Sequence, residues 1–307
     1  MASPLPGGPI FDCHCHLYAP QFEASSIPGL LAEARAAGVG AIVTVPETLA
    51  DARAVLALAS TNPLTAPRAG LHPVQPAAAP HTPGAGAEGG GLGGGCGGGG
   101  VRSVRFDEVA PALDFIRAHA HELVAVGEVG LDFSPHVLAG DESQRDAQRA
   151  AFSAQIALAS ELGLPLNVHS RSAGHHAIEL LLEHQVQQGV LLHAFDGRAA
   201  HALRAVDRSP AFFFSVAPSV ARSPQQQKLV AALPLDRLVL ETDAPALGPV
   251  KGEPNRPANI AIALSELARI KGVAVSEAAR ATSENALRLF PRLRRWGDAA
   301  AAAAVGG

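Results

Sequence analysis

Histidine and acidic residues follow several short apolar runs in this chain, which has 13 histidines among 307 residues. The first run ends in Asp12-Cys13-His14-Cys15-His16. Side chains alternate between the faces of a strand, so Asp12, His14 and His16 are expected on one face and both cysteines on the other. Two imidazoles on one face can bind a metal ion. A surface or purely structural role is the alternative for such a pair taken alone.

Another apolar run contains an acidic side chain, in the sequence Val-Ala-Val-Gly-Glu-Val-Gly-Leu-Asp that ends at Asp132. A carboxylate such as Glu128 is costly to bury unless it is paired or binds a cation. Gly127 and Gly130 beside it allow the backbone to come close to a neighbour. A structural ion pair with an arginine is the alternative for Glu128, and Asp132 is a weaker candidate for a supporting or substrate contact.

Two later runs end in histidine. His169 follows Asn-Val and shares a face with Arg171, whose guanidinium can bind phosphate oxygens in a bidentate manner. His193 follows an entirely apolar run. A salt bridge at the rim is the alternative for Arg171, and a hydrogen-bonded core histidine is the alternative for His193.

The last run ends in Glu241-Thr242-Asp243. Asp243 stands where a metal ligand or a general base is expected, and Glu241, one layer deeper, is interpreted as a structural partner inside the protein. His72, in Gly-Leu-His-Pro, is a candidate substrate contact, with turn capping as the equal alternative.

The elements that position these residues are eight short apolar runs separated by helix-compatible stretches, the pattern of a parallel sheet covered by helices. The runs comprise residues 9–16, 40–45, 69–72, 123–130, 165–169, 191–195, 211–216 and 238–243. This pattern predicts an α/β protein with a single-domain (β/α)8 TIM barrel, and a doubly wound open sheet is the alternative. The absence of a GxGxxG sequence after the first run disfavours a dinucleotide-binding version of that alternative.

The carboxyl ends of the strands of such a barrel meet at one mouth. The candidates there comprise four imidazoles and two carboxylates: His14, His16, Glu128, His169, His193 and Asp243. Each residue alone is a weak indication of function. Their shared position at strand ends predicts one metal-binding mouth.

Composition limits the remaining possibilities. Residues 84–100 hold 12 of the 31 glycines, and we expect residues 76–103 to form a disordered insertion with Cys96 exposed. We expect residues 1–8 to be an extension, 9–296 the barrel and 297–307 a disordered tail.

The net charge of −4 excludes binding of nucleic acid by bulk positive charge. With no membrane-spanning run and no signal segment visible, a soluble intracellular protein of the cytoplasm or nucleus is expected, with no membrane or stable protein partner.

The ordered motifs FDCHCHL, GLHPV, VGEVGLDFSP, NVHSR, LLHAFDG and LVLETDAPAL resemble those of the TatD-type metal-dependent hydrolases, from about residue 9 to 292. The resemblance implies a distorted TIM barrel with two divalent metal ions, Mg²⁺, Mn²⁺ or Zn²⁺. By the same resemblance, His14, His16 and Asp243 bind one ion, His169 and His193 bind the other, and Glu128 bridges them.

The resemblance also implies a deoxyribonuclease, either a 3′-exonuclease on single-stranded DNA, an endonuclease at abasic sites, or both. Asp243 and Glu128 are the catalytic candidates, with Asp243 as the base, and Arg171 and His72 are the phosphate contacts. A barrel amidohydrolase or esterase acting on a small molecule with the same metal site is the alternative, and a metal-stabilised scaffold is a further one.

One loop departs from the family pattern. The segment after the last strand usually reads like RNEP, followed by one residue and Asn, whereas this chain has Glu-Pro-Asn-Arg-Pro-Ala-Asn at residues 253–259. Pro254 and Arg256 occupy the usual Arg and Glu positions. The departure affects the expected contacts at the rim, and not the metal ligands.

Overall fold

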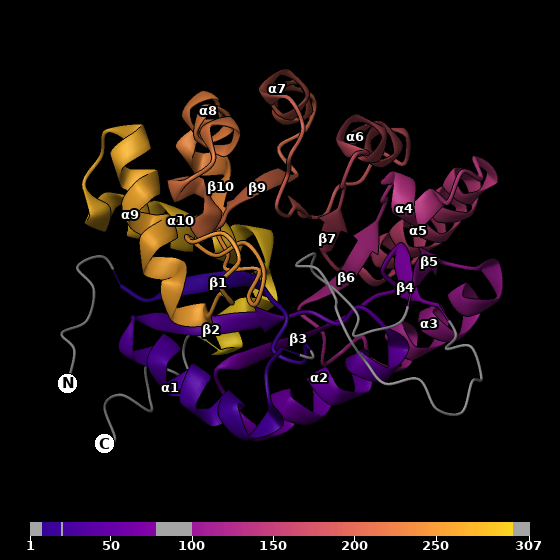
Figure 1. The fold of residues 1–307 in the computed structure, drawn as a ribbon, viewed down its shortest axis with the longest axis horizontal. Coiled ribbons are helices and arrows are strands. Elements are labelled where there is room, and N and C mark those ends of the chain that lie inside the picture. Colours follow the sequence, from indigo (N-terminus) through magenta and orange to yellow (C-terminus); the bar gives the residue numbers. More distant parts are fainter. Residues whose placement is uncertain (1–7, 20, 78–99, 297–307) are drawn as a thin grey trace.

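The computed structural model describes residues 8–19, 21–77 and 100–296, in which eight parallel strands form a nearly closed barrel with helices around it (Figure 1). Their order around the sheet is β1, β2, β3, β6, β7, β8, β9 and β10. The strands are β1 (Ile10–Cys15), β2 (Val39–Thr44), β3 (Thr65–Ala69), β6 (Ala125–Gly130), β7 (Leu166–His169), β8 (Val190–Leu192), β9 (Phe212–Val216) and β10 (Leu238–Leu240). The predicted TIM barrel is therefore confirmed.

Helices connect the strands. The α-helices are α1 (Ile27–Ala36), α2 (Leu49–Thr61), α3 (Phe106–His119), α4 (Pro135–Leu138), α5 (Ser143–Leu162), α6 (Gly174–Glu183), α7 (Ala199–Arg208), α8 (Pro224–Ala232), α9 (Ile260–Lys271) and α10 (Val275–Leu289). Short 3₁₀ turns are η1 (Ala24–Ser26), η2 (Pro218–Ala221), η3 (Leu235–Arg237), η4 (Pro257–Asn259) and η5 (Pro291–Leu293). Gly163 and Gly272 end α5 and α9 in the left-handed conformation that glycine adopts without strain.

The first and last strands meet through the residues that follow β10. The amide of Asp243 donates to the carbonyl of His14 at 2.8 Å, and the amide of His16 donates to the carbonyl of Ala244 at 2.9 Å. Asp12 adds a side-chain link, because its carboxylate accepts hydrogen bonds from the amide and hydroxyl of Thr242 at 2.9 and 2.6 Å. These contacts bring the end of β1 against the segment that carries Asp243.

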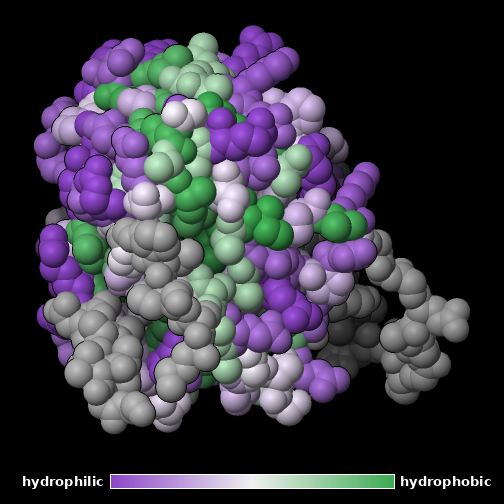
Figure 2. Space-filling model, turned by 90° about the vertical axis from the view of Figure 1, so that its left-hand side faces the viewer, coloured by the Kyte–Doolittle hydropathy of each residue, from purple (hydrophilic) through white to green (hydrophobic). Residues whose placement is uncertain are grey.

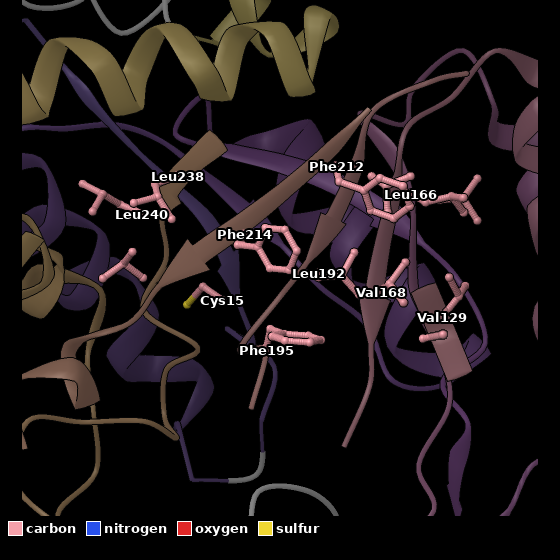
Figure 3. Packing of buried hydrophobic residues seen from close by; sticks show 14 of the residues in the cluster. Cys15, Val129, Leu166, Val168, Leu192, Phe195, Phe212, Phe214, Leu238 and Leu240 are labelled. Carbon is pink, nitrogen blue, oxygen red and sulfur yellow. The ribbon is translucent and has the colours of Figure 1, made fainter. Parts of the chain in front are cut away.

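Apolar side chains fill two layers. One cluster lies between the strands and the surrounding helices and includes Phe212 and Phe214 of β9 (Figure 3). The other draws Leu191, Phe213, Val239 and further residues from seven of the eight strands, together with the end of α10 and η5, so it fills the inside of the barrel. Because side chains alternate along a strand, residues two positions beyond this inner layer also point into the barrel, nearer its mouth.

The third strand lies four residues earlier than predicted. The apolar run 69–72 suggested its position, but β3 spans Thr65–Ala69. Pro67 and Arg68 made this strand hard to recognise in the sequence. Proline has no N–H to donate to a neighbouring strand, and arginine is rarely buried. Arg68 is nevertheless fully buried, where its guanidinium donates to the carbonyl of Cys13 and lies 4.7 Å from the centre of the Phe290 ring.

Two short strands overlap the ends of the expected disordered insertion, about residues 76–103. Strands β4 (Val74–Pro76) and β5 (Val101–Ser103) pair in an antiparallel hairpin. Glycine content alone could not show this pairing. Residues 78–99, which include Cys96, lie outside the described residues, as do residues 1–7 and 297–307, so the division of the chain into extension, barrel, insertion and tail stays a prediction.

The exposed surface is mostly polar. Among the described residues, the large apolar side chains that are exposed are Phe106, Val250 and Val275. On the face shown in Figure 2, hydrophilic residues lie on both sides of a narrow apolar band. No helix in the described part of the chain has the length and apolar character to span a membrane.

Candidate metal centre

The six predicted donors converge at the carboxyl ends of the strands. They come from β1 and the residue after it, from β6, from the end of β7, and from the segments that follow β8 and β10. The six are His14, His16, Glu128, His169, His193 and Asp243, and three overlapping groups of possible metal ligands include all of them. Residues as far apart in the sequence as His14 and Asp243, 229 positions, therefore supply one cluster.

Glycines let the strands beneath the centre approach closely. A Cβ on Gly127 would lie 2.7 Å from the Cβ of Asn167, and a Cβ on Gly130 would lie 2.1 Å from the carbonyl oxygen of His169. Gly130 also has a φ of +137°, which side-chain-bearing residues rarely adopt. The predicted close approach is confirmed, and it places Glu128 beside β7.

One donor group surrounds one oxygen of Glu128. The Nε2 atoms of His14 and His16 are 2.9 Å apart. Each lies 3.4 Å from Oδ1 of Asp243 and 3.5 Å from Oε2 of Glu128. A tetrahedral ion with bonds of about 2.0–2.1 Å separates its ligand atoms by about 3.3–3.4 Å. The two imidazoles and two carboxylates are thus spaced to hold a divalent cation.

A second group surrounds the other oxygen of Glu128. Oε1 lies 2.7 Å from Nε2 of His193, 2.9 Å from Nδ1 of His169 and 3.4 Å from Nε2 of His72. The His14 and His193 rings stack at 3.8 Å, so the two groups adjoin. Imidazole and carboxylate donors of this kind suit Zn²⁺ or Mn²⁺, and carboxylates also bind Mg²⁺.

Burial and neighbouring charges shift the pKa values of the histidines in this centre in opposite directions. Burial and the neighbouring His193 hold the pKa of His14 well below its usual value, which leaves a neutral imidazole. Burial also lowers the pKa of His16, but Asp243 and Glu128 outweigh it and raise that pKa to about 10. Asp132 and Glu128 likewise outweigh the burial of His169 and raise its pKa to about 9. A metal ion bound by His16 or His169 would therefore compete with protons for these side chains.

The carboxylate of Glu128 is held ionised. Burial alone would raise the pKa of Glu128, yet His193, His72 and His14 around it hold that pKa well below its usual range. A negative charge in the barrel without a compensating cation would be costly, so the surroundings of Glu128 favour positive ligands.

Sequence reasoning missed part of the support around the donors. Nδ1 of His14 lies 3.1 Å from Oδ1 of Asn167, and Nε2 of His169 lies 3.1 Å from Oδ2 of Asp132. Asp132 was only a weaker candidate, and Asn167 had no predicted role. Asn167 precedes His169 by two residues in the same strand, and a polar side chain inside an apolar strand was the signal that could have found it.

The structure also locates the remaining sequence candidates. Asp12 does not line the centre, because its carboxylate accepts hydrogen bonds from Thr242. His72 is buried at the edge of the second group, and its Nδ1 lies 3.1 Å from both the amide nitrogen and the carbonyl oxygen of Val74. Arg171 is exposed near the mouth, and its charge acts on the neighbouring Asp196, which in turn is near His169. His72 thus lies beside the second donor group, and Arg171 follows the donor His169 by two residues.

The two cysteines of the first motif do not share one face as strict alternation predicted. Cys13 lies in the inner cluster and Cys15 in the outer one. The pairing of β1 with β2 changes register between Asp12 and Cys15, so the alternation is interrupted just before His16. Both thiols are buried and free.

Comparison with known proteins finds relatives over almost the whole chain. A family profile described as TatD related DNase matches residues 11–291. The chain belongs to the TatD-related DNase family. Human deoxyribonuclease TATDN3 is 43% identical over 286 residues, which cover 93% of this chain and 96% of the human protein.

Bacterial relatives of this TatD-family chain are described as metal-dependent hydrolases. The Escherichia coli protein YjjV, described as uncharacterized, is 32% identical over 283 residues, covering 91% of this chain and 96% of YjjV. The crystal structure of this E. coli TatD homolog superimposes with a TM-score of 0.75 at 26% identity over 92% of this chain and 98% of the other. Family membership confirms the predicted family and class of enzyme, a hydrolase that acts on ester bonds.

Proposed function

We propose that this chain is a deoxyribonuclease that hydrolyses DNA phosphodiester bonds with two divalent metal ions. The observation that carries this proposal is the position of Glu128, whose two carboxylate oxygens face two different donor groups. Oε2 lies 3.5 Å from Nε2 of His14 and of His16, and Oε1 lies 2.7 Å from Nε2 of His193. A carboxylate in this position can bridge two ions.

Each of the two donor groups would bind one ion. His14, His16, Asp243 and one oxygen of Glu128 would hold one ion, and His169, His193 and the other oxygen of Glu128 would hold the second. Such a pair of ions lowers the pKa of water and stabilises both the attacking and the leaving oxygen of an in-line displacement. The name of the human relative, a deoxyribonuclease, supports DNA as the substrate.

Asp243 is the candidate general base. Its side chain is 12% exposed, whereas that of Glu128 is 2% exposed, so Asp243 is the more accessible of the two carboxylates to water. It has a φ of +52°, an unusual conformation that aspartate tolerates better than most residues. One oxygen faces His14 and His16. The carboxylate is thereby placed to accept a proton from the water that attacks phosphorus.

His72 and Arg171 are the candidate phosphate contacts. Nε2 of His72 faces the second donor group, 3.4 Å from Oε1 of Glu128. In the tautomer with hydrogen on Nε2, the ring can donate that hydrogen to a phosphate oxygen. The exposed guanidinium of Arg171 can bind a phosphate next to the bond that is cleaved.

For the form of DNA, we propose removal of nucleotides from the 3′ end of single strands, incision at abasic sites, or both. The test uses purified full-length protein with one labelled single-stranded DNA and one labelled duplex containing a single abasic site. Mg²⁺, Mn²⁺ and Zn²⁺ are compared, each with and without EDTA. We expect cleavage that EDTA abolishes, and the fragment lengths distinguish trimming from incision.

Absence of EDTA-sensitive cleavage on both DNAs with every metal would contradict the proposal. The same preparations are assayed with carboxylic esters and lactones, because other hydrolases with this barrel act on small molecules. Metal-dependent turnover of those compounds without DNA cleavage would instead favour a small-molecule esterase. A matched variant, Asp243→Asn, identifies turnover that depends on this centre.

A further inference from the structure

Each imidazole in the candidate centre has two nitrogens, and only one can face an ion. The other nitrogen is held by an oxygen in two cases: Asn167 lies 3.1 Å from Nδ1 of His14, and Asp132 lies 3.1 Å from Nε2 of His169. Such contacts fix the tautomer and orientation of a metal-binding histidine. For His193, Nε2 faces Glu128 and Nδ1 is buried without a hydrogen-bond partner in the described chain.

The nearest acceptor recorded for that nitrogen is Glu241. Its side chain is fully buried, and its Oε2 lies 3.8 Å from Nδ1 of His193. Oε2 also has no hydrogen-bond partner among the described residues. Val239 belongs to the inner cluster, so Glu241, two residues later, points into the barrel from β10 just as His193 follows Leu191 from β8. An unused acceptor therefore lies close to an unused donor position.

The other oxygen of Glu241 is already engaged. Oε1 accepts the amide hydrogen of Ala194 at 3.0 Å, immediately after His193, and Ala194 has a φ of +44°. Ser215 Oγ accepts the same amide hydrogen at 2.9 Å. Glu241 is thus anchored to the backbone that carries His193, and a movement of about 1 Å would bring Oε2 within hydrogen-bond distance of Nδ1.

On the basis of the proposed two-ion centre, we propose that Glu241 is a positioning residue for His193. Its Oε2 accepts the Nδ1 hydrogen of His193, which leaves the lone pair of Nε2 directed at the second ion. Glu241 has no exposed surface and does not reach the substrate. It acts on the reaction only through His193.

The substitution Glu241→Gln separates this role from simple filling of space. Glutamine has nearly the same shape but only one acceptor oxygen, while Ala194 and His193 both require an acceptor. If the glutamine oxygen keeps the hydrogen bond from the Ala194 amide, the side-chain NH₂ group faces His193. This group donates to Nδ1 and so favours the ring tautomer with hydrogen on Nε2. That tautomer cannot bind the second ion.

The experiment measures the affinity and number of Mn²⁺ ions bound by full-length wild type, Glu241→Gln and Glu161→Gln, using isothermal titration. Glu161→Gln is the matched control, because it makes the same chemical change at an exposed carboxylate that pairs with Arg117. We expect two ions on the wild type and on the control. In Glu241→Gln, we expect the first ion to bind normally and the second 10–100-fold more weakly, the effect typical of losing a partner of a metal-binding histidine.

Two ions bound by Glu241→Gln with wild-type affinity would overturn the role of Glu241 and leave the proposed function intact. A wild type that binds a single ion would overturn the two-ion centre and this role with it. Nitrogen-15 NMR of the wild type loaded with diamagnetic Zn²⁺ gives a test that needs no variant. We expect a hydrogen on Nδ1 of His193, and a His193 ring without a hydrogen on Nδ1 would overturn the proposal.

Discussion

At the residue scale, the donors of this centre differ in how strongly they hold a proton. His14 is neutral because burial and His193 oppose its charge, whereas carboxylates keep His16 and His169 protonated to pKa values of about 10 and 9. The same carboxylates that attract a metal ion therefore attract protons when no ion is bound. Metal binding and pH are coupled through His16 and His169.

This coupling predicts how the metal-free protein responds to pH. An unfolded histidine has a pKa of about 6.5. Because the folded pKa values of His16 and His169 are higher, their contribution to stability is complete below pH 6.5 and is lost as pH rises through about 9 to 10. We expect the melting temperature in EDTA to fall across this range. His16→Gln should flatten the fall, and a pH dependence identical to that of the wild type would contradict this assignment.

A second prediction concerns the ligands themselves. Removing one imidazole from the first donor group in His16→Ala should lower kcat for metal-dependent cleavage of DNA by more than about 100-fold, since even partners that only orient ligands are worth about 10–100-fold. His121→Ala is the control, because His121 is 80% exposed on the surface. Equal loss in both variants, measured at saturating Mn²⁺, would show that the effect is not specific to the centre.

At the element scale, α5 holds two of the loops that border the centre. Gln155 accepts from the amide of Leu71 at 2.8 Å and donates to its carbonyl at 3.0 Å. Gln148, two turns earlier, does the same for Asp132 at 2.7 and 2.8 Å. Both glutamines are buried, so the side chains of one helix fix the backbone beside His72 and at Asp132.

The contact to Leu71 gives a prediction for stability. Gln155→Ala leaves a buried amide and a buried carbonyl without partners, and each costs about 1–3 kcal/mol. We expect the free energy of unfolding in urea to fall by at least about 1 kcal/mol. Gln144→Ala, at a partly exposed position in the first turn of α5 whose side chain donates to the exposed Asp141 side chain, should change it by less than about 0.5 kcal/mol. A similar change in both variants would mean that the contact to Leu71 contributes no specific stability.

At the scale of the whole molecule, the sequence was enough to predict the barrel and the common mouth of the six donors, because strand ends alone bring those residues together. It was not enough for Asn167, and it predicted Glu241 as a buried structural partner without naming its contacts, because the partners of a buried polar residue depend on distant segments. Asn167 contacts His14 across 153 positions. The position of β3 could not be predicted either, because Pro67 and Arg68 are not typical of a buried strand.

The whole barrel should also respond to the ions, because the donor groups connect β1, β6 and β7 with the segments that follow β8 and β10. An ion that binds only the folded state stabilises it by about 2.7 kcal/mol at a concentration of 100 times its Kd. We therefore expect Mn²⁺ to raise the melting temperature of EDTA-treated, dialysed protein by several degrees, and EDTA to reverse the rise. His14→Ala/His16→Ala should lose most of this response while remaining folded. A double variant that responds as strongly as the wild type would place the stabilising ions elsewhere than between β1 and Asp243.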